Sequence, residues 1–371
     1  MAEAASTPAV RGRSYGALAM LRLRRNRGAM ASLVVLALIV LAAIVGPSLT
    51  GHPYDRIYPD YVREPASLAL HPADDRLRPA LERIAARMRF TVETMRVEGD
   101  VVRATLTSPR PDARNLALIA RSDLFGEAAI TGRQDGDRRI EVAIPIKRMR
   151  FIAGTDSNGR DLLTRMFIAA RISLAIGLLA SSVALVIGVA WGATAGYLGG
   201  RTDTVMMRVV DILYSLPFIF FVILLVTFFG RNFLLMFLAV GAVEWLDMAR
   251  IVRGQTLSLK RQEFVAAAEA LGVETAGIIR RHIIPNLIGP VIVYVTLLVP
   301  KVILLESFLS FLGLGVQEPL TSLGVLISDG AKSIQGGAYL LIWPASLLIL
   351  LLLALNFIGD GLRDALDPKD R

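Results

Sequence analysis

Apolar runs recur along the chain at the length that a membrane-crossing helix needs, roughly 20 residues. Four of them contain no Lys, Arg, Asp or Glu: residues 28–51, 172–200, 212–230 and 333–359. Two more qualify only if charged residues inside the membrane are accepted: 232–243, which continues through Glu244 and Asp247, and 283–300, which continues through Lys301 and Glu306. The pattern therefore predicts six transmembrane helices.

The composition agrees with this pattern. Hydrophobic residues make up 54% of the 371 positions, charged residues make up 20%, and the mean hydropathy is +0.55. These values predict an integral membrane protein. The net charge of +9 does not indicate nucleic-acid binding, because the arginines stand beside apolar runs rather than in a stripe with interleaved aromatic residues. The chain has no cysteine, which excludes disulfides and thiolate metal sites.

The distribution of Lys and Arg over the short loops predicts the orientation, since cytoplasmic loops carry an excess of these residues. One set of segments holds 17 of them: the amino terminus, 201–211, 250–281 and the tail after 360. The short loops on the other side hold only Arg231 and Lys332. Both termini are therefore predicted to be cytoplasmic. The basic approach to the first run also fits a signal peptide, but the run is too long and no A-x-A site follows, which favours a retained anchor.

The long segment between the first two runs, residues 52–153, is predicted to be an extracytoplasmic domain. A helix-like stretch at 78–88 is followed by two alternating stretches around Glu98-Gly99-Asp100, which is a hairpin signal. A helix-like stretch at 112–121 and a strand pair at 126–131 and 138–144 complete a small α+β insert. No metal cluster or nucleophile–base pairing stands out in it, which favours a packing or docking role.

A polar helix-turn-helix, residues 263–286, stands between two apolar runs on the predicted cytoplasmic side. Four apolar residues fall at helical spacing on one face: Phe264, Ala267, Ala268 and Leu271. Gly272 is the expected left-handed stop, and Pro285 follows where the segment turns into the next run. An amphipathic helix on lipid headgroups would explain the stripe and the nearby arginines. It would not explain three consecutive alanines and a glycine stop, so a partner surface is favoured.

Charged residues within the apolar runs and one polar turn are further candidates. Lys301 and Glu306 are five positions apart, a poor spacing for a helical pair, so at least one is predicted to face the pathway or another subunit. Glu244 and Asp247 share a helix face, where an interface is favoured over a substrate site. The turn 155–159 has Asx chemistry that would cap a helix beginning near Arg160.

Five ordered stretches resemble the permease subunits of bacterial ABC importers, in particular the C-type permease of the dipeptide/oligopeptide/nickel group. They are Gly154-Thr155-Asp156-x-x-Gly159-Arg160-Asp161; Gly196-Tyr197-x-Gly199-Gly200; Phe264-Val265-x-Ala267-Ala268-x-Ala270-Leu271-Gly272 with Arg281-His282-Ile283-Ile284-Pro285-Asn286; Glu306-x-x-Leu309-Ser310-Phe311-Leu312-Gly313-Leu314-Gly315; and Gly359-Asp360-Gly361-Leu362-Arg363-Asp364-Ala365-Leu366-Asp367-Pro368. The resemblance is close over residues 150–371 and looser over 12–50. Ala266 stands where the family usually has Glu, so Glu263 or Glu269 would replace that residue, or the chain would do without it.

The resemblance implies an all-α polytopic membrane protein, a type I ABC importer-like permease with six transmembrane helices and the small α+β extracytoplasmic insert. The implied segments are a cytoplasmic amino-terminal segment 1–27, a first transmembrane helix 28–51, the insert 52–153, and a permease core 154–371 with five transmembrane helices and a cytoplasmic coupling helix 262–272. The implied ATPase-coupling residues are Glu263, Phe264, Ala267, Ala268, Leu271, Gly272, His282, Pro285 and Asn286. The implied contacts with a binding protein at the external mouth are Gly154, Thr155, Asp156 and Gly159, and the pathway candidates are Lys301 and Glu306.

The resemblance also implies a bacterial inner-membrane location, lipid contacts, and three kinds of protein partner: a second homologous permease subunit, two ABC ATPases and an extracytoplasmic solute-binding protein. The chain has no G-x-x-x-x-G-K-[ST] motif, so we expect ATP and Mg²⁺ on the ATPases, no cofactor or metal on this chain, and no enzymatic activity of its own. A peptide is the default substrate, and the long insert is similar to that of a microcin-peptide importer's permease. Two alternatives remain: a secondary transporter or channel, and an enzyme or sensor anchored by its apolar runs.

Overall fold

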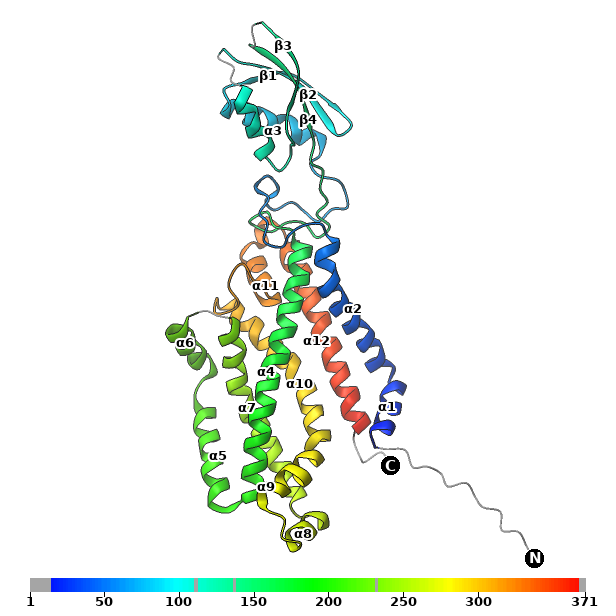
Figure 1. Ribbon diagram of the computed structural model, residues 1–371, viewed down its shortest axis with the longest axis vertical. Coiled ribbons are helices and arrows are strands. Elements are labelled where there is room, and N and C mark those ends of the chain that lie inside the picture. Colours follow the sequence, from blue (N-terminus) through cyan, green and yellow to red (C-terminus); the bar gives the residue numbers. More distant parts are fainter. Residues whose placement is uncertain (1–14, 110–112, 136–137, 231–232, 367–371) are drawn as a thin grey trace, which may run out of the picture. The chain divides into compact units, whose positions relative to one another are not determined.

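The computed structural model describes residues 15–109, 113–135, 138–230 and 233–366, and its ribbon is drawn in Figure 1. Its contacts divide the chain into two compact units. Unit 1 consists of Met1–Gly46, Phe167–Ser328 and Pro344–Arg371, and unit 2 of Pro47–Met166 and Asp329–Trp343. The parts of the sequence predictions that fall on residues 1–14, 112, 231–232 and 367–371 lie outside the described residues.

The described part of the chain is mostly helical, and four of the helices in it are long and apolar enough to cross a membrane. They are α2 (Arg27–Leu49), α4 (Leu162–Leu198), the continuous stretch Thr275–Phe311 that ends in α10 (Ile284–Phe311), and α12 (Tyr339–Leu366). The pair α5 (Gly200–Ser215) and α6 (Phe218–Phe229) would make a fifth span, but it bends by 82°. The apolar run 212–230 is thus divided between two helices. Pro217 stands at the break, where it lacks the N–H that would continue α5.

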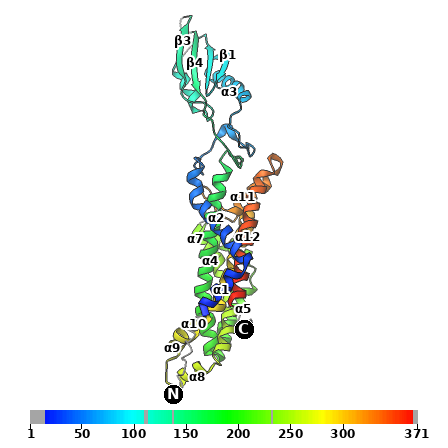
Figure 2. The same cartoon turned by 90° about the vertical axis from the view of Figure 1, so that its right-hand side faces the viewer.

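Helices α4, α7 (Phe233–Leu259) and α10 lie side by side in unit 1 (Figures 1 and 2). Gly188, Gly192 and Gly196 follow one another at four-residue spacing on α4, and a Cβ on any of them would collide with α7. Small residues at this spacing let two helix backbones approach closely. Close packing of this kind joins helices inside a membrane, where the hydrophobic effect does not drive their association. The glycine ladder of α4 therefore positions α7, which carries four charged residues.

The other helical elements of unit 1, and those of the segment Asp329–Trp343 of unit 2, are short. They are α1 (Tyr15–Arg25), α8 (Glu263–Ala270), α9 (Thr275–Ile278), the π-helical turn η3 (Ile279–Ile283), α11 (Leu323–Lys332) and the 3-10 turn η4 (Ile334–Gly336). Figure 1 shows α8 and α9 together at the end of unit 1 where α4 leads into α5. At that corner, Gly199 and Gly200 adopt the left-handed region, with φ of 68° and 55°, which glycine populates without steric cost.

Unit 2 contains a four-stranded antiparallel sheet in the order β1-β2-β4-β3. Its strands are β1 (Thr91–Glu98), β2 (Val101–Thr107), β3 (Ala129–Gln134) and β4 (Arg139–Pro145). Helix α3 (Asp74–Arg87) lies against one face of the sheet (Figures 1 and 2). The alternate residues of β2 and β4 that point to α3 are buried, as the period-2 pattern of a half-covered sheet requires. The short turns η1 (Pro59–Tyr61) and η2 (Ala113–Arg121) are 3-10 helices.

Candidate functional sites

Helix α8 presents apolar side chains outward. Val265 and Ala268 are buried against unit 1, whereas Phe264 is 40% exposed and Leu271 is 83% exposed. The predicted stripe is therefore split, since Ala268 packs inward while Phe264, Ala267 and Leu271 face outward. Large apolar side chains that are exposed together are typical of a protein–protein contact surface. We call Phe264, Ala267 and Leu271 the α8 surface.

The chain leaves α8 through a left-handed glycine and returns through a π-helical turn. Gly272 has φ of 79°, and no atom lies within 4 Å of the position that a Cβ would take there. His282 lies in the π-helical turn η3, and Asn286 donates a hydrogen bond to its carbonyl oxygen at 2.6 Å. Pro285 stands in the first turn of α10, directly after the π-helical turn. Glu263, Pro285 and Asn286 are exposed, and His282 is half-buried.

Polar contacts at the end of α4 hold α8 in place. The hydroxyl of Tyr197 donates to the carboxylate of Glu269 at 2.8 Å, and Lys260 Nζ donates to the carbonyl oxygen of Tyr197 at 2.6 Å. Of the two carboxylates that the sequence offers in place of the family's usual Glu, Glu269 is engaged inside the chain and Glu263 is exposed. The Gly-Tyr-x-Gly-Gly motif thus has a local role, which is to anchor α8.

Tyr197→Phe removes this anchor without changing the shape of the ring. We expect the free energy of local opening of α8 to fall by about 1.5–3 kcal/mol, the usual contribution of a hydrogen bond to a charged group. Hydrogen exchange of the α8 amides in the full chain measures this loss. Tyr214→Phe is the matched control, because its ring contacts Arg250 through its face and we expect α8 exchange to be unchanged. Equal exchange of α8 in Tyr197→Phe and the unmodified chain would contradict the anchoring role.

The turn at Gly154–Asp161 in unit 2 is a closed hydrogen-bonded structure. Asp156 Oδ1 accepts the backbone N–H groups of Asn158 and Arg160 at 2.9 and 2.8 Å. Its Oδ2 accepts from the side chains of Arg160, at 2.8 Å, and Arg165. Thr155 Oγ1 accepts the N–H of Glu64 at 2.8 Å and donates to the carbonyl oxygen of Tyr61. The Asx chemistry predicted for this turn therefore organises the turn itself.

The cap of α4 comes from Asp161, not from the turn residues 155–159. Asp161 Oδ2 accepts the N–H of Thr164 at 2.7 Å, which is the usual geometry of an N-cap. Burial raises the pKa of the Asp161 carboxyl, and the hydrogen bonds from Thr164 lower it in part. Gly154, Thr155, Asp156 and Gly159 are buried, while Ser157 and Asn158 are exposed at the tip of the turn. A partner at this turn would therefore meet Ser157 and Asn158 first.

Lys301 of α10 joins both carboxylates of α7. Its Nζ lies 2.8 Å from Glu244 Oε2 and 3.1 Å from Asp247 Oδ2. These three side chains line a cavity of about 360 Å³ in unit 1, together with the break between α5 and α6. The other residues of its wall are Leu213, Tyr214, Leu216, Pro217, Phe218, Phe221, Ala242, Val243, Leu246 and Leu305. We call this cavity the α5–α7 pocket.

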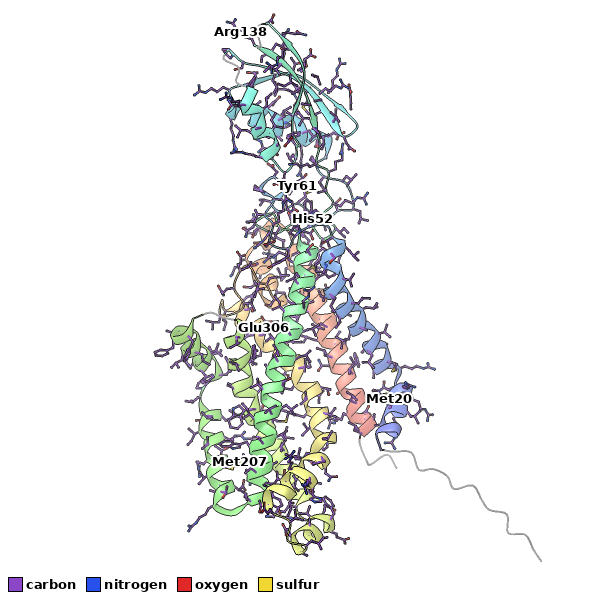
Figure 3. The ribbon with its side chains drawn as sticks, viewed as in Figure 1. Met20, His52, Tyr61, Arg138, Met207 and Glu306 are labelled. Atoms are coloured by element: carbon purple, nitrogen blue, oxygen red, sulfur yellow. The ribbon has the colours of Figure 1, made fainter. Side chains whose placement is uncertain are left out.

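Glu306 is not among the residues that line that pocket, and it lies among the helices of unit 1 (Figure 3). It is fully buried, and its carboxylate accepts hydrogen bonds from Ser310 at 2.7 Å and from Ser173 at 3.3 Å. Ser173 also accepts the N–H of Leu323 at 3.1 Å. The structure therefore does not bring the two predicted pathway residues together: Lys301 lines a cavity, and Glu306 links α4, α10 and the start of α11.

Sequence reasoning placed Glu244 and Asp247 at an interface and did not connect them with Lys301. Two more ion pairs were also missed: Arg253–Asp203, bidentate at 2.5 and 2.6 Å, and Arg250–Asp211 at 2.9 Å. Their common signal is a charge on α5 or α10 opposite a charge on α7, which is visible only once the helices are paired. Within the described ranges, no three His, Cys, Asp or Glu side chains come together that could hold a metal ion.

Two family profiles match the chain. The profile described as "Binding-protein-dependent transport system inner membrane component" matches residues 184–371. The profile described as "N-terminal TM domain of oligopeptide transport permease C" matches residues 14–71. The residues that the first profile matches include α7, α8 and α10. These helices carry the α8 surface and the charged side chains of the α5–α7 pocket.

Curated relatives match the same region. The oligopeptide transport system permease protein OppC of Escherichia coli is 64% identical over 59% of this chain and 72% of its own length. The protein of the same name from Haemophilus influenzae is 56% identical over 64% of this chain and 76% of its own. The dipeptide transport system permease protein DppC of Bacillus subtilis is 48% identical over 59% and 68%. Among solved structures, an inward-facing MetNI methionine ABC transporter chain is 19% identical over 53% of this chain and 94% of its own, with a TM-score of 0.45.

Proposed function

Because this chain belongs to the family of binding-protein-dependent transport system inner membrane components, we propose that it is one permease subunit of an ATP-driven ABC importer of peptides. The observation that carries the proposal is the α8 surface, which combines exposed apolar side chains with a left-handed glycine stop. The names of the relatives, which include oligopeptide and dipeptide transport permeases, support a peptide as the substrate.

The proposed topology has six membrane spans. Four are the long apolar helices α2, α4, α10 and α12; the bent pair α5–α6 and the charged helix α7 are the other two. The excess of Lys and Arg supports a topology in which both termini and the α8 surface are in the cytoplasm of a bacterial cell. The proposed segments remain 1–27, 28–51, the extracytoplasmic α+β insert 52–153, and the core 154–371. A strand-rich insert outside the membrane is consistent with the rule that only helices or closed barrels span a bilayer.

The proposed role of the coupling helix 262–272 is to follow the movements of an ATPase. Only three residues separate α7 from α8, and α9 follows within five residues of the end of α8, so a displacement of α8 reaches α7 and α10 directly. Closure of an ATPase pair would move these helices as rigid bodies and alternate the access of the pathway. This requires that the nucleotide states of the ATPase bind the α8 surface with different affinity.

ATP and Mg²⁺ are proposed to reside on the partner ATPases, with this chain having a transport role only. A second permease subunit would complete the pathway, and a solute-binding protein would deliver the peptide on the extracytoplasmic side. Ser157 and Asn158 are the exposed residues of the turn at which that protein is proposed to dock. Of the two pathway candidates, Lys301 is favoured over Glu306 because it lines the α5–α7 pocket. Charged groups at membrane depth tend to pair with one another or to face water.

The test is whether uptake needs ATP hydrolysis. The full chain, purified with the proteins that assemble with it and reconstituted in liposomes, is expected to accumulate a labelled tripeptide only when ATP is present on the ATPase side. A variant of the associated ATPase without its P-loop Lys is the control, and uptake should fall to background. Uptake that continues unchanged without ATP hydrolysis would favour the alternative function, a secondary transporter or channel.

A further inference from the structure

The α5–α7 pocket carries an unbalanced charge. Two carboxylates, Glu244 and Asp247, face one ammonium group, that of Lys301. Within the described ranges, Lys301 is the cation that ion pairs join to them. Charges in a low-dielectric wall are costly unless they are paired, so the excess negative charge favours a second cation in the pocket. The two carboxylates lie one helical turn apart on α7, which directs both to the same side.

The two carboxylates differ in accessibility. Glu244 is 5% exposed and has the shorter contact with Lys301, at 2.8 Å, whereas Asp247 is 30% exposed with its contact at 3.1 Å. Asp247 contacts Lys301 through Oδ2, which leaves Oδ1 for another donor. Glu244 and Lys301 therefore form a nearly neutral pair, and Asp247 is the carboxylate that a ligand in the pocket would reach.

The rest of the wall suits a cation attached to an apolar body. Phe218 and Phe221 line the pocket, and aromatic faces attract ammonium groups. The ring of Tyr214 already has the guanidinium of Arg250 4.2 Å from its centroid, so the two phenylalanines are the rings available to a ligand. The remaining wall is aliphatic, so beside the hydroxyl of Tyr214 it provides no polar group that would select particular side chains.

We propose that the α5–α7 pocket binds the free α-ammonium terminus of a peptide, with Asp247 as the recognition carboxylate. The proposal rests on the proposed function, since it names the part of the peptide that the permease itself recognises. Peptides of different sequence share only their backbone and their two charged termini. A pocket with one accessible excess carboxylate and an apolar wall recognises the positive terminus and tolerates any neighbouring side chain. Lys301, which contacts both carboxylates, positions Asp247 and neutralises the charge of Glu244.

Equilibrium binding without the binding protein tests this recognition directly. The complex that contains the full chain is placed in lipid nanodiscs without ATP, and labelled trialanine is displaced by two competitors. Trialanine amide keeps the ammonium and lacks the carboxylate, and we expect it to compete as well as trialanine. N-acetyl-trialanine lacks the ammonium, and we expect it to bind about tenfold or more weakly, the order expected for a lost charge-assisted hydrogen bond.

Variants assign the effect to the residue. Asp247→Asn is expected to weaken trialanine binding about tenfold or more and to abolish the difference between trialanine and N-acetyl-trialanine. Asp247→Glu keeps the charge and should keep the preference for a free ammonium. Asp211→Asn is the matched control: it makes the same chemical change on α5, where Asp211 pairs with Arg250 outside the pocket wall, and trialanine affinity should not change.

Three results would overturn the proposal: no saturable trialanine binding to the unmodified complex, equal competition by the two modified peptides, or unchanged affinity in Asp247→Asn. Each of these results concerns peptide recognition in the pocket and does not depend on whether uptake requires ATP. A complex that imports trialanine with ATP but shows no ammonium preference would refute the recognition site alone. A complex whose peptide uptake is independent of ATP would refute the proposed function, whatever its pocket binds.

Discussion

Asp156→Ala is expected to lower the stability of the turn in unit 2 by about 3–5 kcal/mol, the cost of removing one partner from a buried ion pair. Asp156 is the shared acceptor of Arg160 and Arg165, and all three side chains are less than a tenth exposed. Without this carboxylate, two buried guanidinium groups lose the acceptor that they share. The backbone N–H groups of Asn158 and Arg160 lose their acceptor as well.

Hydrogen exchange of the full chain, read over residues 154–165, measures this loss. Exchange of those amides should accelerate on the order of a hundredfold or more, given a factor of ten for each 1.4 kcal/mol. Asp74→Ala is the control, since Asp74 pairs with Arg148 at the surface and is 63% exposed; exposed pairs contribute about 1 kcal/mol or less. An effect of Asp156→Ala as small as that of the control would mean that the buried arginines find other acceptors.

Gly272→Arg is expected to abolish ATP-driven uptake while the chain remains in the membrane. Gly272 follows directly after Leu271, which is 83% exposed, and is itself exposed. An arginine there adds a long charged side chain beside the apolar contact that we propose for the ATPase. It also has to adopt a left-handed conformation, with φ of 79°, which costs a residue with a Cβ about 1–2 kcal/mol.

The control separates these two effects. Gly272→Ala imposes the same backbone strain, and its Cβ meets no atom within 4 Å, so we expect it to retain much of the uptake. The measurements are ATP-dependent uptake of a labelled tripeptide and the amount of chain and ATPase that purify together. Normal uptake by Gly272→Arg would contradict a coupling role for α8, and equal loss in both variants would assign the defect to the backbone rather than to the surface.

Local patterns predicted the elements whose signals are local. The hairpin expected around Glu98-Gly99-Asp100 corresponds to β1 and β2, which end and begin at Glu98 and Val101. Gly272 was expected to be left-handed, and it is. Both features depend on a few consecutive residues: the alternation of apolar positions and the freedom of glycine at positive φ. The apolar run 212–230 shows what such patterns cannot predict. Its hydropathy indicates a stretch long enough to cross a membrane but does not indicate that the helix bends within it, and Pro217 was the one local signal of the bend.

Periodicity placed Phe264, Ala267, Ala268 and Leu271 near one another but could not say what they face. Their outward or inward position follows from Val265 and Ala268, which pack against unit 1. The same limit applies to Lys301: its carboxylate partners are 57 and 54 positions away in the chain. No spacing rule within one helix relates such residues, because the rotation of each helix is set by its neighbours.

The sequence by itself determined the class of protein, the family and the places where the motifs occur, because these follow from hydropathy, charge distribution and short ordered patterns. Only the tertiary structure decided which charges meet, which side of α8 is exposed, and that Asp247, and not Glu306, lines a cavity with Lys301. The reason is physical: ion pairs and cavities join residues from different helices, and the packing of those helices, including the glycine ladder of α4 against α7, selects one set of contacts among many that the sequence would allow.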